Sequence, residues 1–294
     1  ETQPDEEYLE KSVRAQAEIA QNTPKEPIEI SSFYNFFSLF IPTQSYFTTP
    51  LLIWANILVW LIMSLMGANG FTADVSDLID WGGNISHLTI ESGWWRLLTA
   101  MFLHGGLIHL VSNCVGLAIA GLYLESLLKK WGFLFFYLLT GIIASCSSLF
   151  WYENIVCVGA SGAIFGMFGF LITALLFKSI QRKFQINSVI SILVFVGINL
   201  LGSFGKGIDS AAHIGGFSSG ILLGVFFHLL RSFPVVNYTV SAVATLIISA
   251  SLIGTVLKNR QYEYQLQEYW GAMNEFSSME KRAIDGYYYP YGNN

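Results

Sequence analysis

Ser161 and His213 are polar residues with the chemistry of hydrolases, and each stands at the start of an apolar stretch. Ser161 lies in the sequence Gly159-Ala160-Ser161-Gly162. A serine hydroxyl becomes a strong nucleophile when a base within about 2.6–3.2 Å accepts its proton, and histidine often provides that base. Polar groups inside membrane-type segments are costly and usually functional. The pair therefore predicts hydrolysis by a serine nucleophile that lies below a membrane surface.

Hydrolysis by a serine also needs hydrogen-bond donors for the oxyanion, and His109 and Asn113 are candidates for that role. They are four residues apart and so share one face of a helix. Ser161 at a helix start adds free backbone N–H groups and a favourable helix dipole. Asp209 precedes His213 by four residues, where it is better placed to cap the following helix than to join the site. We therefore expect a Ser–His dyad and not a triad.

Small residues follow both the serine and the histidine. They are Gly162, Gly166 and Gly169 after the serine, and Ala212, Gly216 and Gly220 around the histidine. Faces of this kind let two helix backbones approach closely in a membrane. We therefore expect the two helices to pack together and bring His213 to Ser161. Phe165, one turn after the serine, is expected to stack on the imidazole.

The composition places most of the chain in lipid. Hydrophobic residues make up 53% and charged residues 12% of the chain, whereas soluble domains carry about 25% charged residues. The net charge of −5 arises largely in the tails, 1–30 and 258–294, so nucleic-acid binding has no support. Cys114, Cys146 and Cys157 lie in or beside apolar runs without metal-ligand spacing. We expect buried thiols and neither a disulfide framework nor a metal site.

The apolar pattern predicts a polytopic helical membrane protein. A span of about 30 Å needs roughly 17–25 apolar residues, and seven stretches qualify. They are 50–67, 104–124, 132–151, 160–178, 186–204, 211–230 and 236–257. The segment 68–100 is too polar to span but contains three tryptophans, which favours a loop in the membrane interface.

Basic residues beside the spans predict the N-terminus inside and the C-terminus outside. In that orientation the inner segments carry Lys25, Lys129, Lys130, Lys178, Arg182, Lys183 and Arg231, and the outer ones Arg96, Lys206, Lys258 and Arg260. The second, fourth and sixth spans then all enter from the outside. His109, Asn113, Ser161 and His213 are consequently expected at one depth, in the outer half of the membrane.

Each feature also has a simpler interpretation. A lone serine in a membrane helix usually bonds its own backbone, and a Gly-x-x-x-Gly face usually serves packing alone. His104 is expected to be structural and His228 interfacial. The sequence around Ser161 lacks the last glycine of a nucleophile elbow, and no strand precedes it. A soluble hydrolase is therefore excluded, and only the combination of residues favours catalysis.

Over about residues 50–231 the chain resembles the rhomboid family of intramembrane serine proteases. The similar motifs are Gly159-Ala160-Ser161-Gly162, Ala212-His213-Ile214-Gly215-Gly216, His109-Leu110-Val111-Ser112-Asn113, the pair Trp95-Arg96, and His104. The resemblance implies that Ser161 and His213 are catalytic, that His109 and Asn113 bind the oxyanion, and that Trp95 and Arg96 belong to the first loop.

The resemblance also implies an all-α fold with a six-helix core, one extra C-terminal transmembrane helix, and cleavage of single-span membrane proteins near their outer end. No cofactor or metal is implied, and the cell (inner) membrane is the expected location. The oligomeric state stays open. The expected regions are a polar segment with an interfacial aromatic stretch (1–49), the catalytic core (50–231), the seventh helix (232–257) and a polar, tyrosine-rich tail (258–294).

Two positions depart from the family pattern. Phe165 stands where many members have tyrosine, and Glu125 begins no Glu-x-Arg motif, which puts a structural ion pair in doubt. Two other functions compete with proteolysis. An inactive relative that binds or chaperones transmembrane clients is disfavoured because Ser161 and His213 are both present. A channel or transporter is disfavoured because the inner halves of the fourth and sixth spans are largely apolar.

Overall fold

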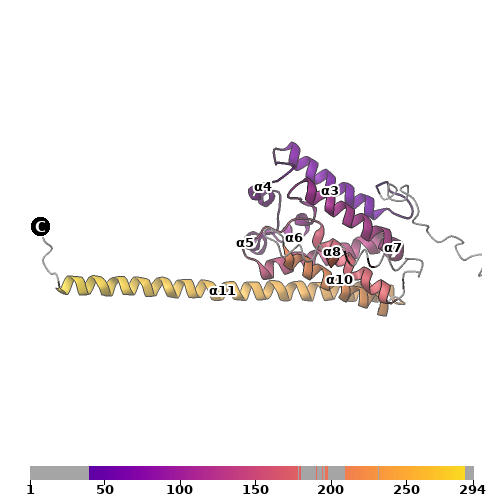
Figure 1. Cartoon of the computed structure of the whole chain (residues 1–294). Helices are drawn as coiled ribbons and strands as arrows, with labels where there is room; N and C mark the ends of the chain where they lie inside the picture. The colour runs from indigo at the N-terminus through magenta and orange to yellow at the C-terminus, as the bar shows by residue number, and fades with distance from the viewer. Residues whose placement is uncertain are drawn as a thin grey trace, which may run out of the picture.

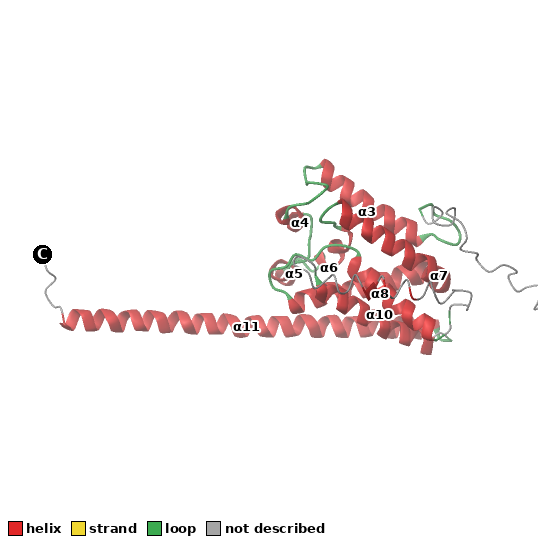
Figure 2. Cartoon of the chain, in the orientation of Figure 1, coloured by secondary structure: helices red, strands yellow, loops and turns green. Residues whose placement is uncertain are grey.

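The computed structural model describes residues 40–177, 209–230 and 232–288, and a few single residues between 179 and 197. Residues 1–39 of the predicted segment 1–49 and most of the predicted fifth span, 186–204, lie outside the described residues. The described part is helical, and Figure 2 shows no strand in it. Its elements are α3 (Thr48–Leu65), α4 (Val75–Asp80), α5 (Ser86–Glu91), α6 (Arg96–Thr99), η1 (Ala100–Phe102), α7 (Leu107–Trp151), α8 (Ser161–Leu176), α10 (Ser210–Leu230) and α11 (Pro234–Tyr288).

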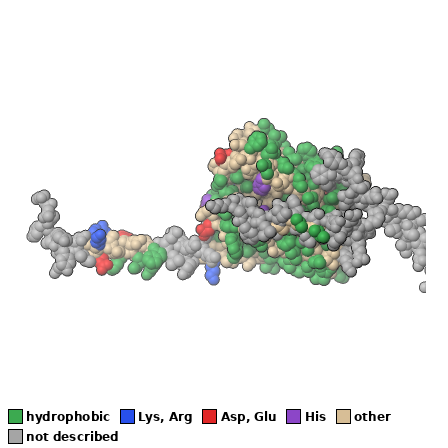
Figure 3. All heavy atoms as spheres, in the orientation of Figure 1, with side chains coloured by type: hydrophobic (Ala, Val, Ile, Leu, Met, Phe, Trp, Pro, Cys, Tyr) green, Lys and Arg blue, Asp and Glu red, His purple; other side chains and the backbone are tan. Residues whose placement is uncertain are grey.

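Four helices in the described residues are long and apolar enough to cross a membrane: α3, α7, α10 and the Pro234–Lys258 part of α11. The chain is therefore an all-α membrane protein with several spans. Figure 3 shows one face of the molecule, on which the coloured side chains of the bundle are mostly hydrophobic. The charged side chains on that face lie at one edge of the bundle and along the far part of α11.

The helix α7 contains two membrane-crossing lengths joined by a bend. Lys129 has φ 61° and ψ 168° there, which is not a helical conformation. The part before it, 107–128, rises about 33 Å at 1.5 Å per residue, enough to cross about 30 Å of hydrocarbon. These two parts correspond to the predicted second and third spans. The bend at Lys129 accordingly lies at a membrane face.

The helix α8 lies at the centre of the bundle, between α7 and α10 (Figure 1). It has 16 residues, of which 12 are buried. A helix of that length rises about 24 Å, less than the hydrocarbon thickness. At least one end of α8 therefore lies within the membrane depth. Ser161 is the first residue of this short helix.

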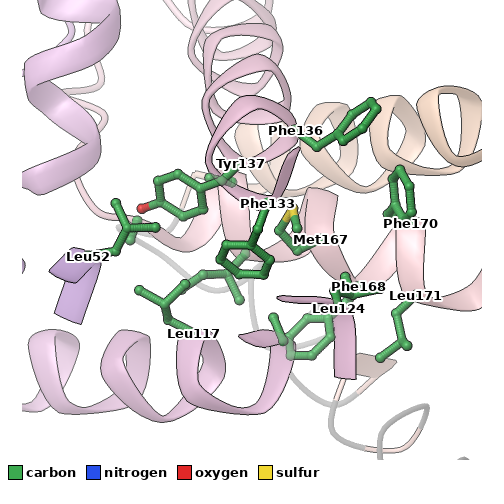
Figure 4. Packing of buried hydrophobic residues seen from close by; sticks show 14 of the residues in the cluster. Leu52, Leu117, Leu124, Phe133, Phe136, Tyr137, Met167, Phe168, Phe170 and Leu171 are labelled. Atoms are coloured by element: carbon green, nitrogen blue, oxygen red, sulfur yellow. The ribbon is translucent and has the colours of Figure 1, made fainter. Parts of the chain in front are cut away.

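Large side chains from α3, α7 and α8 fill the core around this central helix (Figure 4). Phe133, Phe136 and Tyr137 on α7 and Met167 and Phe168 on α8 are almost completely buried. Lipid tails are as apolar as these side chains, so the stabilisation comes from close packing and not from removal of apolar surface from water. The packing fixes the position of α8 against α7, and with it the position of Ser161.

Glu125 on α7 caps the N-terminus of α3. Its carboxylate accepts hydrogen bonds from the backbone N–H groups of Phe47, Thr48 and Thr49, and from the Thr49 hydroxyl. The first N–H groups of a helix lack helical partners and carry the positive end of its dipole. A buried carboxylate is thus compensated without an ion pair. This arrangement explains how the chain manages without the Glu-x-Arg motif.

The segment between α3 and α7 consists of short helices, none of them long enough to span, and its place in the membrane interface stays a prediction. Arg96 donates from one guanidinium nitrogen to the carbonyl oxygens of Ile79 at 2.6 Å and Gly83 at 3.0 Å. Its guanidinium also lies 4.8 Å from the centre of the Trp95 ring. Trp95 and Arg96 therefore hold α4 and the turn that follows it against the start of α6.

The last helix, α11, is longer than the predicted seventh span of 236–257. It begins at Pro234, a residue suited to the first helical position, and continues without a break to Tyr288. The polar tail for which no structure was predicted is therefore helical over 258–288. Figure 1 shows this extension projecting far beyond the bundle, at the end where α4 and α5 lie.

Candidate active site

Ser161 and His213 meet at the first turns of two neighbouring helices. His213 Nε2 lies 2.8 Å from Ser161 Oγ. Ser161 is the first residue of α8, and His213 lies in the first turn of α10. That distance is within the range for proton transfer from a serine hydroxyl to an imidazole. The two residues singled out by their polarity are in direct contact.

Glycines allow this contact by bringing α8 and α10 together. A Cβ added at Gly216 would collide with the carbonyl oxygen of Gly162, and one at Gly220 with that of Gly166. The helix backbones therefore touch at two successive turns, a separation that only residues without side chains allow. The small-residue faces recognised in the sequence are the faces that meet.

The imidazole of His213 is held by an aromatic ring and by no acid in the described residues. Phe165 stacks on it, with ring centres 4.4 Å apart and planes inclined by 26°. Its Nδ1 is buried without a hydrogen-bond partner in the described part of the chain. Asp209 instead accepts a hydrogen bond from the Ala212 N–H at 2.9 Å, as a cap of α10 does. Among the described residues, no carboxylate is hydrogen-bonded to the imidazole.

His109 and Asn113 lie against the backbone just before the serine. Gly159 has φ +113°, a conformation that favours glycine, and its N–H donates to the Ala100 carbonyl oxygen at 2.8 Å. A Cβ at Gly159 would lie 2.7 Å from His109 Nε2 and 3.2 Å from Asn113 Nδ2. The position therefore requires glycine for two reasons. His109 and Asn113, whose side chains can donate hydrogen bonds, thus lie against the backbone two residues before Ser161.

Several hydrogen-bond donors around Ser161 have no acceptor among the described residues. Asn113 Nδ2 is buried and has no hydrogen-bond partner among the described residues. Ala160, the N-cap of α8, has no side chain able to cap the helix. The N–H groups of the first turn, including that of Ser161, consequently have no helical acceptor. These groups form a set of donors of the kind that stabilises an oxyanion.

A cavity of about 890 Å³ contains these groups. Its walls come from α7, α8, α10 and the segment 154–159, which lies just before the serine helix. His109, Asn113, Ser161, Phe165 and His213 all line it. Space for a peptide is therefore present beside the serine.

Two comparisons with known proteins bear on this site. A family model described as "Rhomboid domain" matches residues 91–230. Rhomboid protease AarA of Providencia stuartii is 31% identical over 249 residues, which cover 74% of this chain and 88% of that protein. The chain belongs to the rhomboid family.

Other rhomboid relatives share a smaller part of their length with this chain. Rhomboid protease GluP of Bacillus subtilis (strain 168) is 36% identical over 170 residues, 57% of this chain and 32% of that protein. RHOMBOID-like protein 7 of Arabidopsis thaliana is 36% identical over 164 residues, 54% of this chain and 50% of that protein. The chain thus spans about half the length of this plant relative.

The rhomboid match contains His109, Asn113, Ser161, Phe165 and His213 but not all of the molecule. It ends at residue 230, the last residue of α10. The helices α3 and α11 lie outside it. Phe165 contacts the imidazole of His213 by stacking, and its ring has no hydroxyl that could form a hydrogen bond.

His104 lies beside the site without lining the cavity. It is 1% exposed, its Nδ1 lies 3.3 Å from the Phe102 carbonyl oxygen, and its ring packs edge-on to that of His109 at 5.1 Å. His104 therefore supports the orientation of His109, in agreement with the structural role expected for it. His228 is buried at the other end of α10, where its Nδ1 lies 3.0 Å from Ser179 Oγ.

Sequence reasoning missed the contact between the first loop and the segment before the serine. Asn84 and Cys157 exchange two backbone hydrogen bonds, of 3.0 and 2.8 Å. The side chain of Asn84, which is fully buried, also donates to the Ser145 carbonyl oxygen at 3.0 Å. The first loop is thereby fixed to the wall of the cavity. No local sequence pattern predicts a single pair of backbone hydrogen bonds between residues so far apart in the chain.

Proposed function

We propose that this rhomboid-family chain is an intramembrane serine endopeptidase in which Ser161 is the nucleophile and His213 the base. The observation that carries the proposal is the distance of 2.8 Å between Ser161 Oγ and His213 Nε2. Two bacterial relatives named as rhomboid proteases add support.

In the proposed reaction, Ser161 Oγ attacks the carbonyl carbon of the scissile peptide while His213 Nε2 accepts its proton. The carbonyl oxygen becomes an oxyanion, which accepts hydrogen bonds from His109, Asn113 and the N–H of Ser161. His213 then gives its proton to the leaving amine as the C–N bond breaks. A water molecule, deprotonated by the same imidazole, hydrolyses the acyl-enzyme and regenerates the serine.

The stacked ring of Phe165 maintains the imidazole in the plane that this proton transfer needs. In many hydrolases an acidic residue bonded to Nδ1 performs that task. Here Nδ1 has no partner in the described residues, and the ring contact at 4.4 Å takes over the positioning. Gly159 leaves the cavity wall before the serine without a side chain, Ala160 packs in the core beneath it, and Gly216 and Gly220 hold α10 against α8.

The proposed substrates are single-span membrane proteins, cleaved near the outer membrane face. The short length of α8 supports a position of Ser161 below the membrane surface, and a substrate helix would then unwind locally for its peptide bond to reach the serine. The distribution of basic residues predicts the N-terminus inside and the C-terminus outside. The proposed location is the cell (inner) membrane, and no cofactor or metal takes part in the proposed reaction.

The proposed regions keep their predicted bounds. Residues 50–231 form the catalytic core, and 232–257 add a seventh transmembrane helix. Residues 1–49 and 258–294 lie outside the core. The alternative function is that of a client-binding relative without proteolytic activity. The direct contact of Ser161 and His213 disfavours it, because a binding protein has no need of an aligned nucleophile and base.

A cleavage assay tests the proposal. The full chain is reconstituted with a single-span reporter substrate, and wild type is compared with Ser161→Ala and His213→Ala. Both variants should lose more than about 10³-fold in kcat, as removal of a nucleophile or its base does in other serine enzymes. Ser219→Ala, on the same helix as His213, is the matched control and should cleave like wild type. Cleavage that survives Ser161→Ala would show that the proposed mechanism is wrong.

A further inference from the structure

A second cavity lies at the end of the bundle opposite to the candidate active site. It has a volume of about 1060 Å³. Residues 42–47, which precede α3, line one side, and α7 lines the other with Leu122, Glu125, Ser126 and the two lysines of its bend. The catalytic cavity is lined by Ala73 and Val75, which follow the C-terminus of α3, whereas this second cavity lies at its N-terminus. The two cavities are therefore at opposite ends of α3.

The second cavity lies at the level of a membrane face. The first part of α7 crosses the hydrocarbon in about 33 Å and ends at the bend. Trp131 follows the bend and is 67% exposed, in keeping with the preference of tryptophan for the interface. Any ligand of this cavity therefore meets both water and the lipid headgroups.

Two lysines at the bend make the cavity electropositive. Lys129 and Lys130 both line it. Lys130 Nζ lies 5.4 Å from the ring centre of Phe47 and 5.6 Å from that of Trp131, so two aromatic rings hold its ammonium group in place. The Lys130 carbonyl oxygen also accepts a hydrogen bond of 2.8 Å from Thr48 Oγ1, which ties the bend to the start of α3.

The acidic residue in the wall does not cancel this charge. Glu125 is the one acidic side chain among the described residues that line the cavity. Both of its oxygens already accept hydrogen bonds from the first turn of α3, and the residue is 2% exposed. Its charge is therefore directed at the helix terminus. The two lysines line the cavity together with Ser45 and Ser126, and no other acidic residue is among the described residues of its wall.

The backbone at Lys129 supports a functional interpretation of the bend. A φ of 61° is unfavourable for a residue with a side chain, and Lys129 is the one non-glycine residue with positive φ in the described chain. Glycine at this turn would relieve the strain. Strained residues of this kind tend to occur at ligand sites, and here the strain accompanies a cationic side chain in the wall of a cavity.

From these observations we infer that the cavity binds the phosphate headgroup of an anionic phospholipid. The lysines would pair with the phosphate, the serine hydroxyls would donate to headgroup oxygens, and Trp131 would lie against the acyl chains. A lipid is favoured over a free phosphate because the cavity opens at the membrane face and is bordered by exposed aromatic rings. Binding here is independent of the proposed proteolytic function, since the site is at the other end of the bundle.

Native mass spectrometry of the full chain in detergent tests the inference. Wild type, incubated with phosphatidylglycerol, should retain bound lipid, and phosphatidylcholine should be retained much less. Lys129→Gln with Lys130→Gln should weaken phosphatidylglycerol binding about 30-fold, from the known contribution of basic residues near anionic lipid. The matched control is Lys281→Gln with Arg282→Gln, which removes two exposed charges from the extension of α11 and should bind like wild type.

Two further measurements separate the loss of the cations from damage to the fold. Lys130→Arg should keep binding, because it retains a cation beside the two rings, and the double variant should unfold at the wild-type temperature in lipid-free detergent. Equal retention by the double variant and wild type would overturn the inference. So would equal retention of phosphatidylcholine, or saturation of the site by inorganic phosphate in place of the lipid.

Discussion

The ring of Phe165 lies stacked on the imidazole of His213, with the centres 4.4 Å apart and the planes inclined by 26°. Both residues line the cavity beside Ser161. Among the described residues, the one side-chain hydrogen bond of the imidazole joins Nε2 to Ser161 Oγ. Its orientation consequently depends on packing, which gives Phe165 a larger role than that of an ordinary core residue.

Phe165→Ala should lower kcat about tenfold, because a stacked aromatic pair contributes about 0.5–1.5 kcal/mol beyond its buried area. Phe165→Tyr preserves the ring and should retain nearly full activity. Steady-state kinetics with the reporter substrate separate the two variants. If Phe165→Ala keeps the wild-type kcat, stacking does not position the base.

Asn113→Ala should lower kcat about 10²-fold and leave KM nearly unchanged. The reason is that a donor to the oxyanion acts mainly in the transition state, where its removal typically costs about 10²–10³ in rate. His109→Ala should behave similarly and still allow some labelling of Ser161 by a fluorophosphonate. A rise in KM at constant kcat would instead assign Asn113 to substrate binding.

Gly220→Ala should destabilise the protein by about 1–3 kcal/mol, the usual cost of overpacking, and should also reduce activity. Its Cβ would collide with the Gly166 carbonyl oxygen and push α10 away from α8. Gly254→Ala on α11 is the matched control, since a Cβ there meets nothing within 4 Å. Thermal unfolding in detergent gives the comparison, and equal melting temperatures for the two variants would argue against a close approach of the helices.

Glu125→Gln should destabilise the protein by about 1.5–3 kcal/mol, because charge-assisted hydrogen bonds to the start of α3 become neutral or are lost. Hydrogen exchange should accelerate at the amides of Thr48 and Thr49, which donate to Glu125. Glu91→Gln, which removes an exposed carboxylate, should change neither measurement. Unchanged protection of the Thr48 and Thr49 amides in Glu125→Gln would contradict the capping role.

The sequence was informative where chemistry and periodicity coincide. Ser161 and His213 stand out because polar groups are rare in apolar helices, and the glycines after them predict the faces on which α8 and α10 meet. The helical class and most span positions follow from the length of the apolar runs. These features depend on local residue types, which a sequence displays directly.

Features that depend on distant partners were not predictable. The pairing of Asn84 with Cys157 joins residues far apart in the chain, and the cap formed by Glu125 on α3 is equally non-local. The extension of α11 also escaped prediction, because residues 258–288 lack the apolar periodicity that marks a packed helix. Tertiary geometry and not local propensity determines the first two features.

The most direct test of the proposed mechanism is to identify the residue that forms a covalent adduct with a fluorophosphonate in the folded, membrane-reconstituted protein. Intact-mass measurement followed by peptide mapping should find one adduct, on Ser161, which is absent in Ser161→Ala and strongly reduced in His213→Ala. Labelling of another serine, or no labelling of protein that cleaves its substrate, would contradict the assignment of Ser161 as the nucleophile.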